Sequence, residues 1–161
     1  MSRWQSWSSH IATLAVGISG VVYLIMKYFM TTDDPFAVVN HPLQPVMFDI
    51  HLFAAPLLVF VFGLMFESHI QRKLRAGNPL NRKSGLIAAV TFGIMTLSGY
   101  VFQITATEMV QRAALVLHLI SSGLFLISYL VHQVINFRLW RARVRQQSDW
   151  SAFRLATQRG H

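Results

Sequence analysis

Four long apolar stretches constrain the fold of this chain more than any other feature of its sequence. A helix needs about 20 mainly apolar residues to cross the hydrocarbon core of a bilayer. Four stretches come close to or exceed this length, and they run from Ile11 to Met30, from about Met47 to Phe66, from Leu86 to Ile104 and from Ala113 to Ile135. Only 12% of the residues are charged, about half the share that is usual in soluble domains. We therefore expect an all-α fold, a transmembrane four-helix bundle surrounded by lipid bilayer.

The distribution of Lys and Arg predicts the orientation of this bundle. All of these residues except Lys27 and Arg112 fall on one side of the bilayer. Because cytoplasmic loops carry the excess of Lys and Arg, both termini are expected in the cytoplasm. Residues 1–137 should form the membrane domain and residues 138–161 a basic cytoplasmic tail. The net charge of +8 lies beside apolar stretches, which favours anionic lipid over nucleic acid as its partner.

Four histidines lie in or at the ends of these stretches, at two depths. His118 and His132 are fourteen positions apart in the fourth stretch, which corresponds to about 21 Å along a helix and about 40° around it. His118 is expected near the outer side and His132 near the inner side. His51 lies near the outer end of the second stretch, and His10 lies at the inner start of the first. Depth therefore pairs His51 with His118 and His10 with His132.

Histidine pairs within a membrane call for a chemical explanation, because ionisable side chains there are costly and usually functional. Zinc commonly takes four ligands, often Cys or carboxylate, whereas the chain has no Cys and Asp49 is the only acid within a stretch. Haem iron is satisfied by two axial imidazoles, and small residues would let a flat ring approach the helix backbones. Such residues are Gly17, Gly20, Gly63, Gly99, Ser121, Ser122 and Gly123. The alternative is four unrelated interfacial or hydrogen-bonded histidines.

With these residues the sequence resembles the four-helix di-haem cytochrome b subunits of membrane-bound formate dehydrogenases and nickel–iron hydrogenases, and related small bacterial cytochromes b. The segments that carry the resemblance are WSSHIATLAVGISG, DIHLFAAPLLVFVFG, GNPLNRKSG and HLISSGLFLISYLVH. The resemblance implies that His10 and His132 are the iron ligands of an inner b haem, and that His51 and His118 are those of an outer one. It also places Asn78, in the GNP segment, near a quinone pocket beside the inner haem.

Three other residues have open roles at this stage. His69 follows His51 by eighteen positions, about five turns of a helix. It is a candidate quinone contact, a candidate snorkelling interfacial residue and a rival of His10 as inner ligand. Lys27 and Arg112 are the only bases on the outer side, and both are candidate partners for haem propionates.

The resemblance implies a membrane cytochrome b subunit that transfers electrons through two b haems, between a redox partner at the outer face and the quinone pool. The quinone would be menaquinone or ubiquinone, and the partner a periplasmic or membrane redox subunit of a larger complex. The expected location is the bacterial inner (cytoplasmic) membrane, with several passes. Because no catalytic domain lies outside the membrane, an electron-transfer subunit of an oxidoreductase fits better than a complete enzyme.

Two alternative functions remain open beside an electron-transfer subunit. One is a stand-alone quinone-linked cytochrome b oxidoreductase, which would turn over without a partner subunit. The other is a histidine-lined transporter for protons or metal ions, which would be colourless. The visible spectrum of the purified protein separates the second alternative from the first.

Overall fold

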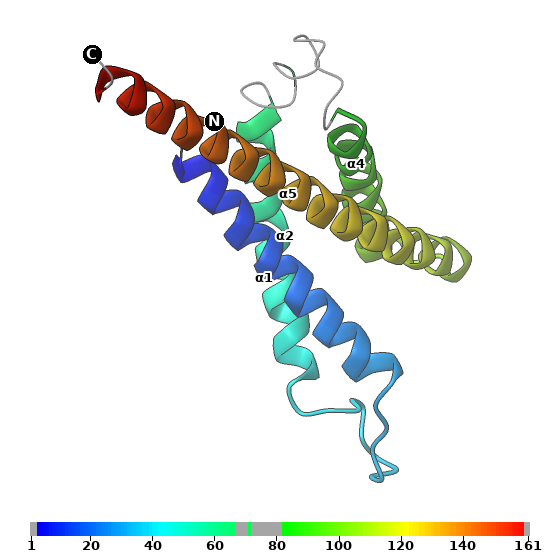
Figure 1. The fold of residues 1–161 in the computed structure, drawn as a ribbon. Helices are drawn as coiled ribbons and strands as arrows, with labels where there is room; N and C mark the ends of the chain where they lie inside the picture. The colour runs from blue at the N-terminus through cyan, green and yellow to red at the C-terminus, as the bar shows by residue number, and fades with distance from the viewer. Residues whose placement is uncertain (1–2, 67–70, 72–81, 160–161) are drawn as a thin grey trace. The chain divides into compact units, whose positions relative to one another are not determined.

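The computed structural model describes residues 3–66, 71 and 82–159, and nearly all of them are helical (Figure 1). The helices are α1 (Arg3–Tyr28), α2 (Gln44–Met65), α4 (Arg82–Ile104) and α5 (Glu108–Arg159), and no strand occurs in these ranges. All four helices are long and apolar enough to cross a membrane. The all-α class is therefore confirmed for the described residues, and so are four helices long and apolar enough to cross a membrane.

The helices extend beyond the apolar stretches that predict them. Helix α1 begins at Arg3, well before Ile11, and α5 continues unbroken through residue 138, where the basic tail was expected to begin, as far as Arg159. Neither Gly nor Pro occurs between Leu124 and Arg159, so nothing in that sequence interrupts the backbone hydrogen bonds. Hydropathy marks the part of a helix that suits lipid, whereas the backbone hydrogen bonds continue into polar sequence.

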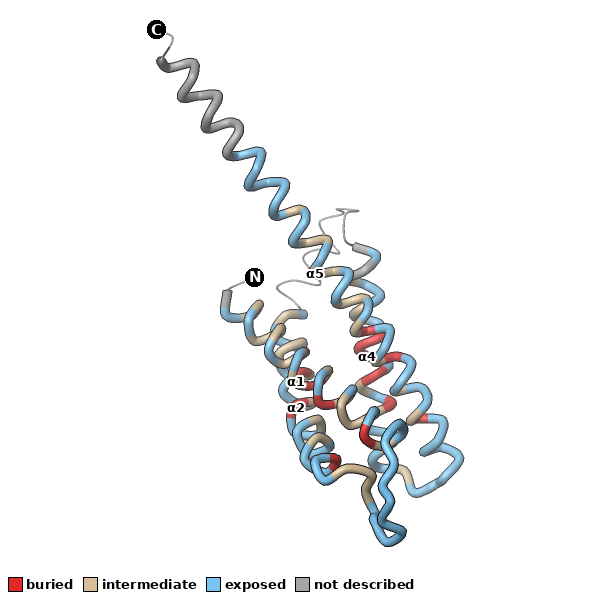
Figure 2. The backbone as a smooth tube through the Cα atoms, turned by 60° about the horizontal axis from the view of Figure 1, so that its bottom comes forward, coloured by how far each residue is buried: buried red, intermediate tan, exposed pale blue. Residues whose placement is uncertain are grey.

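The chain forms two compact units, Met1–Gly77 and Asn78–His161. Helix α1 packs against α2 in the first unit, and α4 packs against α5 in the second. Buried residues form narrow strips on these helices, and most other side chains are exposed (Figure 2). The strips include hydroxyl residues, such as Thr91 and Ser121, which donate back to carbonyl oxygens of their own helices. Such small polar residues are typical of contacts between membrane helices.

In the first unit, α1 and α2 run antiparallel with a register that several contacts define. The rings of Tyr23 and Phe48 have centroids 5.3 Å apart. Three residues back along α1 and three forward along α2, Gly20 lies against the ring of His51. Further along both helices, Thr13 and Leu58 are buried. The half of the unit nearer the loop between α1 and α2 is thus aromatic and polar, and its middle is filled by small and aliphatic side chains.

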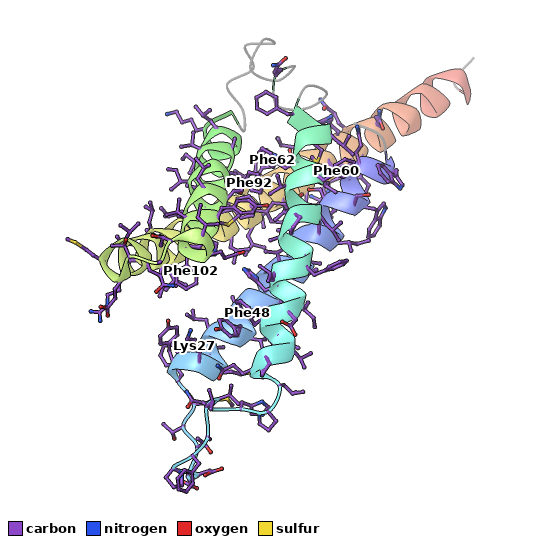
Figure 3. All side chains as sticks on the ribbon, turned by 180° about the vertical axis from the view of Figure 1, so that it is seen from behind. Lys27, Phe48, Phe60, Phe62, Phe92 and Phe102 are labelled. Carbon is purple, nitrogen blue, oxygen red and sulfur yellow. The ribbon has the colours of Figure 1, made fainter. Side chains whose placement is uncertain are left out.

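In the second unit, three pairs of residues follow each other at seven-residue intervals on both helices. Gly99 lies against His118, the rings of Phe92 and Phe125 have centroids 5.5 Å apart, and Gly85 lies against His132. Phe92 is labelled on α4 in Figure 3. A seven-residue repeat of contacts is characteristic of helices that cross at a shallow angle. His118 and His132 therefore both contact α4, with the aromatic pair between them.

The central aromatic pair should contribute strongly to the stability of the second unit. Phe125 is only 5% exposed, and we expect Phe125→Ala to lower the free energy of unfolding by about 3 kcal/mol. This is the low end of the range for buried Phe, because lipid offers the unfolded chain an apolar surrounding as well. The measurement is unfolding in mixed micelles with increasing denaturing detergent.

Phe60 on α2 provides the control, since its side chain is 63% exposed and its location can be followed in Figure 3. Phe60→Ala should change the unfolding free energy by less than about 1 kcal/mol. Equal losses for Phe60→Ala and Phe125→Ala would contradict the importance of the aromatic pair.

Candidate functional site

The imidazole of His51 is held between α2, which carries it, and the backbone of α1. Its Nδ1 lies 3.0 Å from the carbonyl oxygen of Val16 and 3.5 Å from Oγ of Ser19. A Cβ built at Gly20 would lie 2.8 Å from Cε1 and 2.9 Å from Nδ1 of His51. Real Cβ atoms do not approach other atoms so closely, so only glycine leaves room for the ring at this place.

The second unit repeats this arrangement at His118. Its Nδ1 lies 2.9 Å from the carbonyl oxygen of Met95 on α4. A Cβ built at Gly99 would lie 3.0 Å from Nδ1 and 3.1 Å from Cε1 of His118. In both units the accepting carbonyl belongs to the residue four positions before the glycine, one helical turn earlier. In each unit, a histidine on the second helix thus contacts a glycine of the first helix and the carbonyl oxygen one turn before that glycine.

A buried serine precedes the glycine in both units. Ser19 Oγ donates to the carbonyl of Ala15 at 2.6 Å, and Ser98 Oγ donates to that of Ile94 at 2.7 Å. Each hydroxyl is therefore satisfied within its own helix. The Ser-Gly pairs at 19–20 and 98–99 are visible in the sequence, at the middle of the first apolar stretch and in the second half of the third. The sequence alone did not distinguish them from the other small residues, because their role depends on the facing helix.

The carbonyl contacts determine the tautomer of both rings. A carbonyl oxygen only accepts, so Nδ1 must carry the proton and donate it; the proton is assigned from its partner. In a neutral imidazole, Nε2 then carries the lone pair. Histidines that bind a metal through one nitrogen usually donate the other N–H to a carbonyl or carboxylate, which orients the ring and raises its basicity. His51 and His118 have this arrangement.

His10 and His132, which are expected at the inner side, lie on α1 and α5. His132 on α5 lies beside Gly85 of α4, where a built Cβ would be 3.5 Å from Cε1, an ordinary contact. His10 on α1 is half-buried, and the ring of Trp7 meets it edge-on with centroids 6.4 Å apart. Each predicted pair takes one histidine from each unit. His10 and His51 belong to the first unit, and His118 and His132 to the second.

Two predicted site residues, His69 and Asn78, lie outside the described residues, so their roles stay predictions. Within the described part of the chain, no group of three or more His, Cys, Asp or Glu side chains gathers that could hold a metal ion. A haem requires only two axial side chains, which two histidines supply. Comparisons with protein-family models, with curated proteins and with solved structures found no match to this chain.

The close approach of His51 to Gly20 predicts the effect of a single methyl group. Gly20→Ala should destabilise the first unit by about 1–3 kcal/mol, because the added Cβ forces the ring or the helix to move. Gly63→Ala is the control, since a Cβ there meets nothing within 4 Å, and better helix propensity should stabilise it by up to about 1 kcal/mol. The measurement is again unfolding in mixed micelles.

Combining Gly20→Ala with His51→Ala should restore part of the lost stability, because the clash requires both side chains. The second unit allows the same comparison on one helix, with Gly99→Ala as the test and Gly93→Ala, also in open space, as the control. Additive effects of the two substitutions at Gly20 and His51 would contradict the described contact.

Proposed function

We propose that this chain is a membrane cytochrome b that binds two b haems and transfers electrons between a redox partner at the outer face and quinone at the inner side. The observation that carries the proposal is the orientation of His51 and His118. Each donates Nδ1–H to the backbone carbonyl one helical turn before a glycine. In the neutral ring the lone pair is then on Nε2, the nitrogen that would coordinate the iron. These two residues would be the axial ligands of the outer haem.

A simpler role for these histidines is a hydrogen bond between two membrane helices, which polar side chains often make. Two observations favour ligands over this role. The same arrangement of glycine, carbonyl and histidine occurs once in each unit. The two histidines that it contains, His51 and His118, are the pair expected at one depth. Helix α5 also carries His132 on the same α4-facing side as His118.

The inner haem would be held by His10 and His132. Its pairing, like that of His51 with His118, rests on the depth of each residue along its helix. The fourteen residues between His118 and His132 separate the two depths by about 21 Å. Phe92 and Phe125 lie midway between these depths, and they would provide a packed apolar layer between the two haem sites.

The haem iron would supply one-electron redox chemistry, with potentials set by its axial ligands, burial and nearby charges. The protein would orient the imidazoles, exclude water with apolar side chains and supply two histidines to each iron. A site without an open axial position suits electron transfer rather than binding of a substrate to iron. This agrees with an electron-transfer subunit whose catalytic partner is another chain.

The further parts of the proposal follow from charge and from the resemblance. Both termini would be cytoplasmic, in a multi-pass protein of the bacterial inner membrane, because Lys and Arg concentrate on that side. Quinone, menaquinone or ubiquinone, would bind near the inner haem, with Asn78 and His69 as contacts. The partner would be a periplasmic or membrane redox subunit.

Haem content tests the proposal directly. The purified protein should show two low-spin b haems per chain in its reduced-minus-oxidised spectrum, because two imidazoles saturate each iron. His51→Ala should remove one haem and His10→Ala the other. His41→Ala is the matched control, since His41 lies in the loop between α1 and α2 and its Nδ1 accepts from the Leu43 amide. A colourless protein would refute the proposal and favour a transporter.

Quinone binding has a separate test. Asn78→Ala should slow quinone reduction or oxidation several-fold while both haems stay bound, because an amide hydrogen bond to the quinone is lost. Stopped-flow kinetics of haem oxidation with a soluble quinone measure this rate. Unchanged kinetics would place the quinone elsewhere and leave the haem sites standing.

Purification distinguishes a subunit from a stand-alone oxidoreductase. A subunit should co-purify with a redox partner from its native membrane and should not turn over quinone with a diffusible donor alone. Full turnover by the isolated chain would favour the stand-alone oxidoreductase.

A further inference from the structure

Lys27 lies two helical turns beyond the His51 contact, on the same face of α1. Thr13, Gly20 and Lys27 follow each other at seven-residue intervals, so they share one side of the helix. Lys27 is therefore about 10 Å further along the helix axis than Gly20, towards the loop between α1 and α2. Figure 3 labels Lys27 near this end of α1, and Phe48 in the outer part of α2.

The side chain of Lys27 is held in place by aromatic neighbours. Its Nζ donates to the hydroxyl of Tyr23 at 3.2 Å, and it lies 5.5 Å and 5.7 Å from the ring centroids of Tyr23 and Tyr28. Contacts of this kind stabilise an ammonium group over an aromatic face. Tyr23 in turn packs against Phe48, one helical turn before His51. The cation is thus part of the same contact surface as the histidine.

The backbone around Lys27 is also fixed to the start of α2. Asn40 donates through Nδ2 to the carbonyl of Lys27 at 2.9 Å, and its amide N–H donates to Oε1 of Gln44 at 3.2 Å. Gln44 is the first residue of α2 and is buried. These bonds tie the outer end of α1 to the outer end of α2, so the half-buried ammonium has a defined place relative to His51.

Arg112, the other base expected on the outer side, is differently situated. An ion pair joins Arg112 to Glu108, one turn earlier on α5. Both side chains are more than three-quarters exposed, at 78% and 76%. The charge of Arg112 is therefore already compensated in an open surrounding. That of Lys27 has only neutral oxygen and aromatic partners among the described residues.

We propose that the Lys27 ammonium binds a propionate carboxylate of the haem ligated by His51. This inference rests on the proposed function. Propionates leave one edge of the porphyrin, so a cation that binds them must lie along the helices from the axial ligand rather than beside it. Lys27 has this position. A carboxylate at this half-buried site requires a compensating charge, and it would provide the anionic partner that the neutral neighbours of Lys27 do not supply.

The proposal predicts an effect on one haem only. A positive charge near the iron favours the reduced state, so Lys27→Gln should lower the ratio of reduced to oxidised outer haem at a fixed solution potential. A unit charge about 10 Å away implies roughly a tenfold change in this ratio, which for one electron is about 59 mV. The inner haem should not change. Lys27→Arg, which retains the charge, should restore most of the ratio.

Redox titration of the holoprotein in detergent measures both haems, and the outer one is identified by its absence from His51→Ala. Arg112→Gln is the matched control, because it removes the same charge from an exposed ion pair, and it should shift the outer haem much less. An outer-haem shift in Lys27→Gln no larger than that in Arg112→Gln would overturn the proposal. Absence of haem from the wild-type protein would instead refute the proposed function.

Amine labelling provides a second measurement if Lys27→Gln does not fold. Acetylation of the wild-type protein, followed by peptide mass spectrometry, reports how accessible each lysine is. Bound haem should slow the labelling of Lys27 several-fold and leave that of the exposed Lys83 unchanged, in detergent free of anionic lipid. Equal labelling of Lys27 with and without haem would overturn the proposal, as would protection that requires added anionic lipid, since Lys27 would then bind lipid phosphate.

Discussion

The contact between a histidine ring and a glycine on the facing helix is the interaction on which the packing of each unit depends. Helices in lipid gain little from hydrophobic burial against each other, so close packing and hydrogen bonds hold them together. Gly20 and Gly99 provide both. Without a Cβ, the backbone lets the imidazole approach far enough to reach the carbonyl oxygen one turn earlier. The adjacent serines bond within their own helices and leave this approach open.

One such contact sets the register of the whole helix pair, because the helices are long and regular. In the second unit, the contact of His118 with Gly99 is followed by Phe92 against Phe125 and Gly85 against His132, at constant spacing. In the first unit, the contact of His51 with Gly20 is followed by Tyr23 against Phe48. The same register brings Lys27 to the start of α2. A shift of one residue would separate all of these groups.

The same contact affects both the stability of the helix pair and the tautomer of the histidine. The hydrogen bond that holds two helices together places the proton on Nδ1 and so leaves the lone pair on Nε2. Packing therefore orients the imidazole and fixes its tautomer, which is what the proposed role as a haem ligand would require. A protein that places such histidines on rigid helices needs little rearrangement when a cofactor binds. The orientation of these histidines before a cofactor binds is the physical basis of the proposed haem sites. Lys27 would add a positive charge at the outer site.

The sequence by itself determined the helical class, the four helices long and apolar enough to cross a membrane, and the spacing of His118 and His132. These features are local, since a bilayer requires about 20 apolar residues per helix and satisfies no backbone polar group outside a helix or barrel. The apolar stretches do not mark the ends of the helices, since α1 begins at Arg3 and α5 continues to Arg159, because hydropathy does not report where backbone hydrogen bonding ends. Only the tertiary structure decided which glycines face histidines, which carbonyls fix their tautomers, and that Lys27 rather than Arg112 has a charge without a carboxylate partner among the described residues. Each of these depends on the register between two helices, which is set by contacts between residues far apart in the sequence.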